Sequence, residues 1–379
     1  MTLHRMKMAI LSLLLSLLAL GCNKPFVSHV EPGDTEFKDN TAFYSFEDLS
    51  SPKFAALRNK FKLDTVFHGE QDEFKRMLLL RNWIRTVIQI GDFEESYPGD
   101  GFAENILDAG LKGQGYHCGH YMIVQNAVMN SYGYVTRCLG AGPGVKGGPD
   151  GHHGINEIWS NQFHKWFLSD AKYNHHFEKN GIPLSALEIR DEYLKNKVAD
   201  VMLVKGPDRI HIEYDGVADK KGKMIKTTKE DFARTYTWIE WESINNRFTA
   251  WPGNADTLSR LNMFADDYFK THTWIWDNKP HWAYKTNYMV LVEDRSAIEW
   301  TPNTISTKVK TDRNEASIEL SSTTPNLKTY QVKELPDGDW KDIPSAIETK
   351  LRTDKNEMVF RTVNLAGVTG PEHKIIIER

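Results

Sequence analysis

Two stretches in the first half of the chain carry apolar residues at helical spacing. Between Glu70 and Ile90, apolar side chains recur every three or four residues and basic side chains lie between them. From Cys118 onward, apolar residues cover nearly the whole circumference of a helix, which stops at a polar, glycine-containing turn over 130–133. A helix that is apolar on every side is a buried one. The pattern predicts a helix over 70–90 and a buried central helix that begins at Cys118.

Strand patterns follow this buried helix. Tyr134 to Leu139 is typical of a strand, and a glycine-rich loop of twelve residues runs from Gly140 to Gly151. Such a loop is ordinarily a flexible connection, and since it directly precedes the next strand, a mobile lid is the alternative. His153–Trp159 and Lys165–Asp170 are predicted to be two further strands.

The turn between these two strands sets which residues face each other. If an even-length turn is centred on Asn161 and Gln162, Trp159 lies opposite His164 and His153 lies opposite Asp170. Directly opposed residues have Cβ atoms roughly 5 Å apart on one face of a sheet. This register predicts a hydrogen bond between His153 and Asp170, and a shift of one residue would abolish it.

The second half divides into an aromatic-rich part and a part with short strands. The pattern predicts helices over 182–201 and 255–270, with strand-like alternation over 236–251. After about residue 297 the chain shows short alternating runs separated by turn signals: 316–320, 329–334, 347–351, 358–363 and 373–378. These runs indicate a small all-β sandwich. The stretch Phe360–Pro371 resembles the last hairpin of fibronectin type III-like domains.

Composition indicates a globular protein with room for a sizeable core. The chain has 379 residues, of which 40% are hydrophobic and 26% charged, and its formal net charge is −4. Such a length suggests two or three domains. The sequence has no basic stripe, so we expect no nucleic-acid partner.

The N-terminus has the pattern of a secretion signal. Basic residues precede a short apolar run, Ile10 to Leu20, and the sequence Leu18-Ala19-Leu20-Gly21-Cys22 follows. This sequence resembles the lipobox of bacterial lipoproteins, although Ala19 stands where the family usually has leucine. The resemblance implies lipidation of Cys22, a membrane anchor and a location in the cell envelope, at the outer membrane or cell surface of a bacterium. The alternative is an ordinary cleaved signal peptide.

We therefore divide the chain into four regions. They are a signal peptide and lipobox (1–22), a tether and N-terminal segment (23–60), a main domain with an aromatic-rich extension (61–292), and the β-sandwich (293–379).

Cys118 is the candidate nucleophile. Glycines at 113 and 115 lead up to it, and it begins a helix whose first amides carry partial positive charge. Such a position favours thiolate over thiol. By itself a cysteine at a helix start is more often a packed core residue. A disulfide to Cys138 would also remove the nucleophile, and the sequence does not exclude it.

The motifs over 72–175 together resemble the transglutaminase-like superfamily, whose core is papain-like. That family has a tryptophan-bearing helix (Trp83 here) and a nucleophilic cysteine that begins a buried helix (Cys118). It then has a strand with an arginine (Arg137), a His-x-x-x-Glu strand (153–157) and a Trp-x-x-x-Asp strand (166–170). Two positions depart from the family pattern. Gly154-Ile155 replaces the usual Ala-Trp, and Ala171-Lys172 replaces the common Pro-Thr.

The resemblance implies an α+β fold, a buried helix packed on an antiparallel sheet, and a catalytic triad. Cys118 would attack an amide carbonyl, His153 would protonate the leaving amine, and Asp170 would orient the imidazole. The substrate would be a peptide or protein, with hydrolysis favoured over cross-linking and no cofactor required. Further candidates for oxyanion or substrate contacts are Gln114, Trp83, Tyr116, Arg137 and His152.

Other interpretations stay open at this point. Tryptophan and tyrosine clusters over 236–285 suggest a glycan-active enzyme, a lyase or glycosidase, that uses His153 with Tyr116 or Tyr173. A non-catalytic lipoprotein that binds glycan or protein is a third possibility. A metal site built from His117, His120, His175 and His176 is disfavoured, because their spacing is not that of a standard zinc site.

Overall fold

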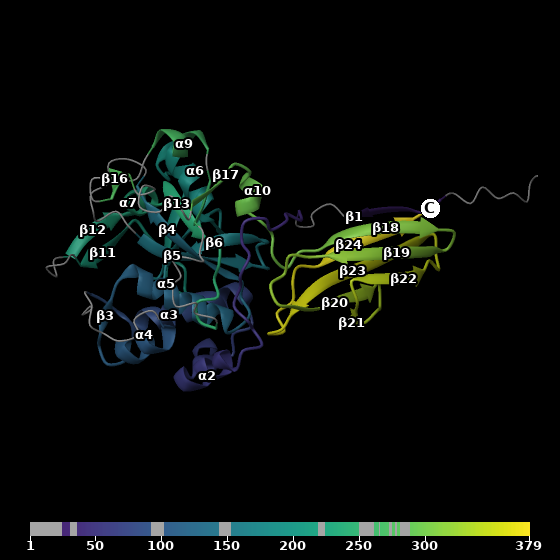
Figure 1. The fold of residues 1–379 in the computed structure, drawn as a ribbon, viewed down its shortest axis with the longest axis horizontal. Helices are drawn as coiled ribbons and strands as arrows, with labels where there is room; N and C mark the ends of the chain where they lie inside the picture. Colours follow the sequence, from purple (N-terminus) through teal and green to yellow (C-terminus); the bar gives the residue numbers. More distant parts are fainter. Residues whose placement is uncertain are drawn as a thin grey trace, which may run out of the picture.

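The computed structural model shows a mixed α+β protein with two parts arranged along its long axis (Figure 1). It describes residues 25–30, 36–91, 102–143, 153–218, 224–249, 261–264, 266–272, 275–276, 279–280 and 289–379. The expected signal peptide with Cys22, the glycine-rich loop beyond residue 143 and His152 lie outside these ranges. The α+β class predicted from the sequence is confirmed.

A layer of helices forms one side of the larger part. It comprises α2 (Pro52–Phe61), the 3-10 helix η1 (Leu63–Phe67), α3 (Glu73–Val87), α4 (Ala103–Gly110) and α5 (Cys118–Asn130). The helix predicted over 70–90 is α3, which is shorter because Asp72 caps its start and the backbone is extended at Ile88. The predicted central helix is α5, whose second half is buried.

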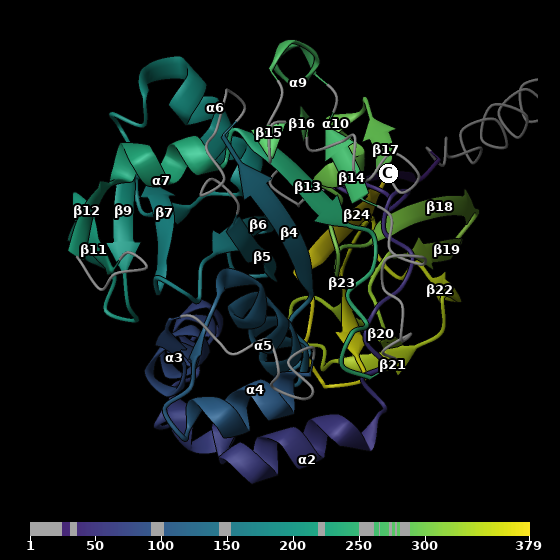
Figure 2. The same ribbon diagram turned by 60° about the vertical axis from the view of Figure 1, so that its left-hand side comes forward.

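The central sheet has the strand order β17-β14-β13-β4-β5-β6. Its members are β4 (Thr136–Gly142), β5 (His153–Ser160), β6 (Lys165–Ser169), β13 (Trp238–Glu242), β14 (Leu261–Phe264) and β17 (Met289–Val292). Figure 2 shows α2 to α5 on one side of this sheet and α6 (Ala186–Asn196) and α7 (Lys229–Thr235) on the other. Separate apolar clusters fill these two interfaces.

Smaller elements complete this part. One sheet has the order β10-β9-β7-β8, and β11 pairs with β12. Their bounds are β7 (His175–Lys179), β8 (Ile182–Pro183), β9 (Met202–Lys205), β10 (Ile210–Ile212), β11 (Tyr214–Ala218) and β12 (Met224–Thr228). The remaining elements are β2 (Gln89–Ile90), β3 (Gly115–Tyr116), α9 (Asp267–Thr271), β15 (Ile275–Trp276), β16 (Lys279–Pro280) and α10 (Arg295–Ile298).

Three predicted elements differ from the structure. The helix expected over 182–201 is only α6, because a capping box of Ser185 and Glu188 starts it and Lys197, in the left-handed conformation, ends it. The strand expected over 236–251 is only β13. In the range expected to be helical, 255–270, α9 confirms the end of the helix, but Leu261–Phe264 form β14, which pairs with β13 and β17, so sheet pairing overrides the helical pattern there.

The C-terminal part is built from two sheets around a third apolar cluster. One sheet has the order β1-β24-β23-β20-β21 and the other β18-β19-β22. The bounds are β1 (Val27–Val30), β18 (Ser306–Asp312), β19 (Glu315–Ser321), β20 (Leu327–Glu334), β21 (Lys341–Ile343), β22 (Ala346–Lys350), β23 (Lys355–Asn364) and β24 (His373–Glu378). All five predicted strands are present in this part, and the pattern missed β18 and β21.

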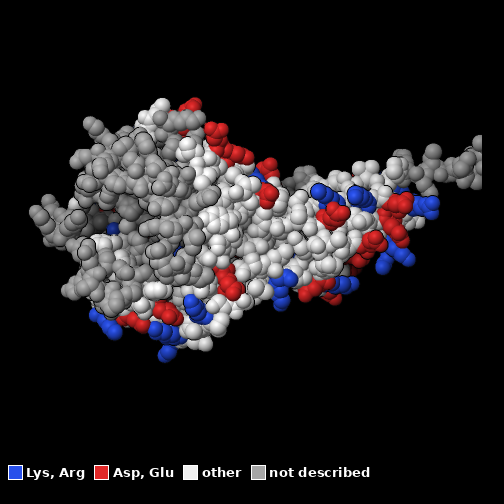
Figure 3. Space-filling view, viewed as in Figure 1, with Lys and Arg blue, Asp and Glu red and all other residues white. Residues whose placement is uncertain are grey.

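The segment expected to be a tether is partly structured. Val27 to Val30 form β1, which pairs antiparallel with β24 and so covers an edge of the C-terminal sheet. This short segment has too few residues to reveal strand periodicity. Lysine, arginine, aspartate and glutamate are interspersed over the described surface of one face (Figure 3), in line with a net charge of −4. Within the described ranges, no helix is long and apolar enough to cross a membrane.

Candidate active site

Cys118 is the first residue of α5 and its side chain is half-buried. His117 precedes it in an extended conformation and makes no side-chain cap. The amides of the first helical turn therefore lack an intrahelical partner and carry partial positive charge beside the thiol. A backbone hydrogen bond from Gly154 of β5 also reaches the sulfur. This environment favours the thiolate.

Gly154 lets the start of α5 approach β5 closely. A Cβ atom at Gly154 would lie 3.3 Å from Cα of Gly119 and 3.6 Å from Sδ of Met122. Gly154 thus sits where the helix and the strand meet. Glycine here keeps the Gly154 amide within reach of the Cys118 sulfur.

Cys118 and His153 are hydrogen-bonded partners with opposite pKa shifts. Burial alone would raise the pKa of the Cys118 thiol, but the bond to His153, its charge and the charge of Lys172 lower it to about 7. Burial would lower the pKa of His153, but the charge and hydrogen bond of Asp170 and the contact with Cys118 raise it to about 9. Between these values the thiolate–imidazolium pair is the favoured state.

Asp170 lies behind the imidazole. Its Oδ2 is 2.6 Å from Nε2 of His153, and its Oδ1 accepts the backbone N–H of Tyr173 at 3.1 Å. The hydroxyl of Tyr236 donates to Oδ2 at 3.5 Å. Although burial opposes ionisation, the charge and hydrogen bond of His153 and the backbone N–H of Tyr173 hold the pKa of Asp170 far below its usual range. The carboxylate fixes which ring nitrogen of His153 bears the proton toward it.

The register that led to this pair was wrong by two residues. The structure pairs Trp159 with Trp166 and Glu157 with Leu168, because the turn contains four residues, 161–164, rather than two. A shift of two keeps every side chain on its face. His153 and Asp170 are therefore diagonal neighbours rather than directly opposed, and their side chains are long enough to meet.

A second tier of buried groups surrounds Asp170, and the sequence did not reveal it. His175 Nε2 lies 3.6 Å from Asp170 Oδ2, and burial lowers the pKa of His175 to about 4. Arg81 of α3 is fully buried, donates to the carbonyl of His175 at 3.0 Å and contacts Nδ1 of His176 at 3.2 Å. Desolvation lowers the pKa of Arg81 to about 9. A neutral imidazole and a buried guanidinium thus border the carboxylate.

Lys172 and Tyr173, which follow Asp170 in the chain, also act on the site. Lys172 lowers the pKa of Cys118 through its charge, and its Nζ lies 5.1 Å from the ring centre of Tyr173. The Tyr173 ring is 5.4 Å from that of His153. Burial raises the pKa of the Tyr173 hydroxyl far above its usual range. Lys172 thus supplies a positive charge near the thiol.

The remaining candidates fall in different places. Gln114 is half-buried in the loop before β3, and its amide donates to the Gly115 carbonyl at 3.1 Å. Tyr116 is completely buried in the helical core, with its ring 4.7 Å from that of His120. Trp83 packs against Phe61 of α2 with 6.3 Å between ring centres. Tyr116 is therefore a core residue, Trp83 is partly buried against the helical core, and Gln114 lies in the loop that leads up to Cys118.

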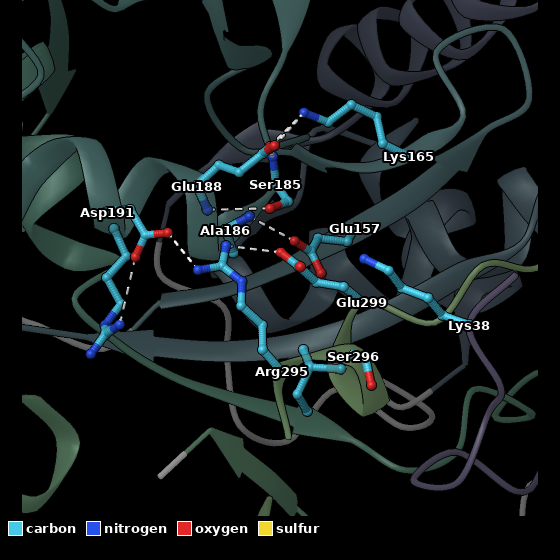
Figure 4. A network of polar contacts seen from close by, with 12 residues as sticks. Lys38, Glu157, Lys165, Ser185, Ala186, Glu188, Asp191, Arg295, Ser296 and Glu299 are labelled. Carbon is cyan, nitrogen blue, oxygen red and sulfur yellow. Dashed lines mark hydrogen bonds and ion pairs between the residues drawn. The ribbon is translucent and has the colours of Figure 1, made fainter. Parts of the chain in front are cut away.

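Arg137 is a structural residue and not a substrate ligand. It is buried, and its guanidinium pairs with Glu157 at 2.5 Å and lies 4.0 Å from the ring centre of Trp166. Glu157 also accepts the indole N–H of Trp241 at 2.9 Å and the amide of Ala186 at 2.6 Å. Figure 4 shows the bond from Ala186 to Glu157 beside the ion pairs of Arg295. This network joins the central sheet to α6.

Cys138 differs from Cys118 in its burial and in the direction of its pKa shift. It is fully buried in β4, and both cysteines are free thiols, so the disulfide alternative is wrong. Burial raises the pKa of Cys138 well above its usual value. Within the described ranges, no group of three metal-ligating side chains forms a site. Trp238 and Trp241 of the aromatic-rich stretch are buried core residues rather than a platform.

Comparisons with known proteins yield one weak structural match of note. The crystal structure of red sea bream transglutaminase matches with 11% sequence identity, over 80% of this chain and 68% of that chain, at a TM-score of 0.25. A TM-score this low does not establish a shared fold. No protein-family model matches the chain. No curated protein matches it either.

Proposed function

We propose that the protein is a cysteine amidohydrolase of the cell envelope, with Cys118, His153 and Asp170 as its catalytic triad. The observation that carries this proposal is the chain of contacts from the Cys118 thiol through His153 to Asp170, 2.6 Å from the imidazole. The half-buried thiol stands at a helix start, and its pKa is lowered to about 7. These are the properties of an activated nucleophile.

The reaction begins with attack of the Cys118 thiolate on an amide carbonyl. The carbonyl oxygen becomes an oxyanion, for which the first amides of α5 are suitable donors, with the Gln114 side chain as a further candidate. The His153 imidazolium donates its proton to the amine as the C–N bond breaks, which leaves a thioester on Cys118. Water then loses a proton to His153 and attacks the thioester, which releases the carboxylic acid and restores the thiolate.

Hydrolysis is preferred to cross-linking because water is always available as the acyl acceptor. The lipobox-like sequence ending at Cys22 adds a lipid anchor to this proposal, and we assign the C-terminal part as a fibronectin type III-like domain. Both assignments rest on sequence resemblance.

A glycan-active enzyme is the weaker alternative. It would need Tyr116 or Tyr173 as an acid or base beside His153. Tyr116 is completely buried in the core, and the pKa of Tyr173 is raised far above its usual range, which makes its phenolate scarce near neutral pH. Neither tyrosine suits proton abstraction from a sugar.

The deciding experiment measures release of new amino groups and of ammonia from a casein digest by purified protein. We expect turnover by the native protein and a loss of about a thousandfold or more in the Cys118→Ala variant. Cys138→Ala is the matched control and should keep its activity. Full turnover by Cys118→Ala would refute the cysteine mechanism. Activity on an acidic polysaccharide that survives Cys118→Ala but not His153→Ala would favour the lyase alternative.

A further inference from the structure

A second concave site lies at the waist between the two parts, away from Cys118. We call it the waist cleft. It has a volume of about 1170 Å³, and its walls are α2, the start of α3, the end of α5 and the hairpin 364–371. In Figure 1 these elements meet below the junction, where α2 faces the loop that follows β23. Ligand sites in proteins are typically smaller than this, so the cleft has room for several monomers of a chain.

The floor of the waist cleft is held by contacts between the two parts. Asn364 donates its side-chain amide to the Gly133 carbonyl at 2.9 Å, and Asn326 bonds both Leu49 and Glu47 at 3.1 and 2.8 Å. Gly133 has a φ of +79°, and a Cβ atom there would lie 2.6 Å from that of Ala366. This close approach leaves the two walls in a defined position, so the cleft is preformed.

Three arginines from three different elements line the waist cleft: Arg58 of α2, Arg76 of α3 and Arg361 of β23. The Arg58 and Arg76 guanidiniums lie 5.5 and 5.9 Å from the ring centre of Tyr132, so they flank a common ring. Arg58 donates to the Ser131 carbonyl, and Arg361 donates to Gln331 at 2.8 Å. Nε of Arg76 is buried without a hydrogen-bond partner among the described residues.

The carboxylates that line the cleft have bonded partners of their own, and the charge of Glu372 also acts on Arg361. Asp64 accepts the Tyr132 hydroxyl at 2.7 Å, and Glu372 lies 4.0 Å from Nζ of Lys333. Glu73 accepts bonds from the β5–β6 turn, including the Gln162 amide at 2.9 Å. Over the described ranges, the ion pairs of the chain leave Arg58, Arg76 and Arg361 without a carboxylate partner. The cleft therefore has an unused capacity to bind anions.

We propose that the waist cleft binds an acidic saccharide chain, whose carboxylate groups pair with Arg58, Arg76 and Arg361. Guanidinium groups bind carboxylates through two parallel hydrogen bonds, which suits repeated acidic sugars. The side chains between the arginines are mostly polar, with Ser50, Gln71 and Gln162 among them, and they can bond sugar hydroxyls. An acidic peptide is the competing ligand.

The backbone of the cleft favours the saccharide over the peptide. Extended peptides commonly bind by adding a strand to a free sheet edge. In the hairpin wall the amides are used internally, since Asn364 N–H bonds Val368 and Gly367 N–H bonds Asn364, at 3.0 and 2.9 Å. In the opposite wall, the first amides of α2 and α3 are bonded to side chains: Lys53 N–H to Ser51, and Phe74 and Lys75 N–H to Gln162 and Asp72. Recognition must come from side chains, which a hydroxyl-rich acidic chain satisfies best.

The waist cleft is separate from the proposed active site. Cys118 begins α5 and Asn130, which lines the cleft, ends it. Thirteen helical residues span about 20 Å. The proposal is therefore independent of the catalytic one, and Cys118→Ala should leave binding unchanged even if it abolishes turnover.

The test is calorimetric titration of the full-length protein with hexagalacturonate at low salt, with maltohexaose and hexaglutamate as comparison ligands. We expect binding of the acidic saccharide, no measurable binding of the neutral one, and binding of the peptide at least tenfold weaker. Arg76→Gln and Arg361→Gln should each weaken binding roughly tenfold or more, because each removes a charge-assisted hydrogen bond. Binding should also weaken as salt is raised.

Matched variants separate recognition from folding. Arg352→Gln removes the same charge from an exposed arginine outside the cleft and should leave affinity unchanged. Arg76→Lys keeps the charge but loses the guanidinium fork, so its affinity should lie between those of the native protein and Arg76→Gln. Equal binding of hexaglutamate would overturn the saccharide assignment. Binding that Arg76→Lys, Arg76→Gln and Arg361→Gln all leave unchanged would overturn the site itself.

Discussion

His153 Nε2 lies 2.6 Å from Asp170 Oδ2, although the two residues are not paired in the ladder between β5 and β6. They meet diagonally, at the end of that ladder, where Asp170 instead forms a bridge with His175. The imidazole is thereby held between a buried carboxylate and the Cys118 thiol. The predictions about the site depend on this arrangement.

The two thiols should differ in reactivity. With the pKa of Cys118 lowered to about 7, a large share of it is thiolate at pH 7.5, whereas the raised pKa and full burial of Cys138 keep it protonated and covered. Iodoacetamide labelling followed by peptide mapping should find rapid alkylation of Cys118 and almost none of Cys138 in the folded protein. Equal alkylation of both would contradict the assigned environments.

The pH dependence of Cys118 alkylation should also show whether Asp170 acts on the imidazole of His153. In Asp170→Asn the carboxylate charge that raises the pKa of His153 is lost, and burial then dominates and lowers that pKa. A neutral His153 stabilises the thiolate less, so the pKa of Cys118 should rise. We expect the midpoint of the alkylation rate against pH to move above 7 in this variant. An unchanged midpoint would mean that Asp170 does not act through His153.

Hydrolysis should depend on pH in a bell-shaped manner if the proposed mechanism holds. Activity should rise through about pH 7 as Cys118 loses its proton and fall through about pH 9 as His153 loses its own. Between these limits the ion pair persists. The profile of kcat/KM on a peptide substrate is the appropriate measurement, and a single-limbed profile over pH 5–10 would argue against the pair.

Adding one methyl group at Gly154 should disturb the site. The new Cβ would lie 3.3 Å from Gly119 Cα, so α5 must move away from β5 and the Gly154 amide must leave the Cys118 sulfur. We expect Gly154→Ala to slow alkylation of Cys118 about tenfold and to raise its pKa. Gly119→Ala is the control, because nothing lies within 4 Å of its Cβ position. That change should be neutral or slightly stabilising.

Glu157 should matter for stability rather than for chemistry. Glu157→Gln would leave the buried Arg137 guanidinium without its counter-ion, a loss of roughly 3–5 kcal/mol in the free energy of unfolding. Asp108→Asn breaks an exposed pair with Lys60 and should cost less than about 1 kcal/mol. Urea unfolding of the two variants compares these costs. Similar midpoints for both would show that the buried pair does not join the sheet to α6 as proposed.

Acid should destabilise the protein partly through His175. Its pKa is lowered from 6.5 to about 4, so the unfolded chain binds more protons than the folded one between these values. The contribution of His175 to stability is therefore present above pH 6.5 and is lost as the pH falls toward 4. The His175→Phe variant retains packing against Phe232. Between pH 7 and pH 4.5, its melting temperature should fall less than that of the native protein.

Much of the site was accessible from local patterns. The start of the buried helix at Cys118 and the strands bearing His153 and Asp170 all follow from apolar periodicity and turn residues, which act within a few positions of the chain. Even with the wrong register, the pairing kept its parity, because a shift of two residues leaves each side chain on the same face. That is why the expected contact between His153 and Asp170 is present.

Contacts between distant segments could not be predicted in this way. Arg81 of α3 donates to the carbonyl of His175, and β1 pairs with β24 across almost the whole length of the chain. Arg137, which the sequence marks as a candidate for substrate contact, pairs with Glu157 in the fold. Such pairs depend on which buried faces meet, and a local pattern records only that a face is buried.

The sequence by itself determined the order of the elements, the cysteine at a helix start and the polar residues that follow it on two strands. Only the tertiary structure decided the four-residue turn, the buried charges around Asp170 and the three arginines of the waist cleft. The physical reason is range: helix and strand periodicity is set by neighbours a few residues apart. Desolvation, ion pairing and cleft shape are set by segments that the fold brings together.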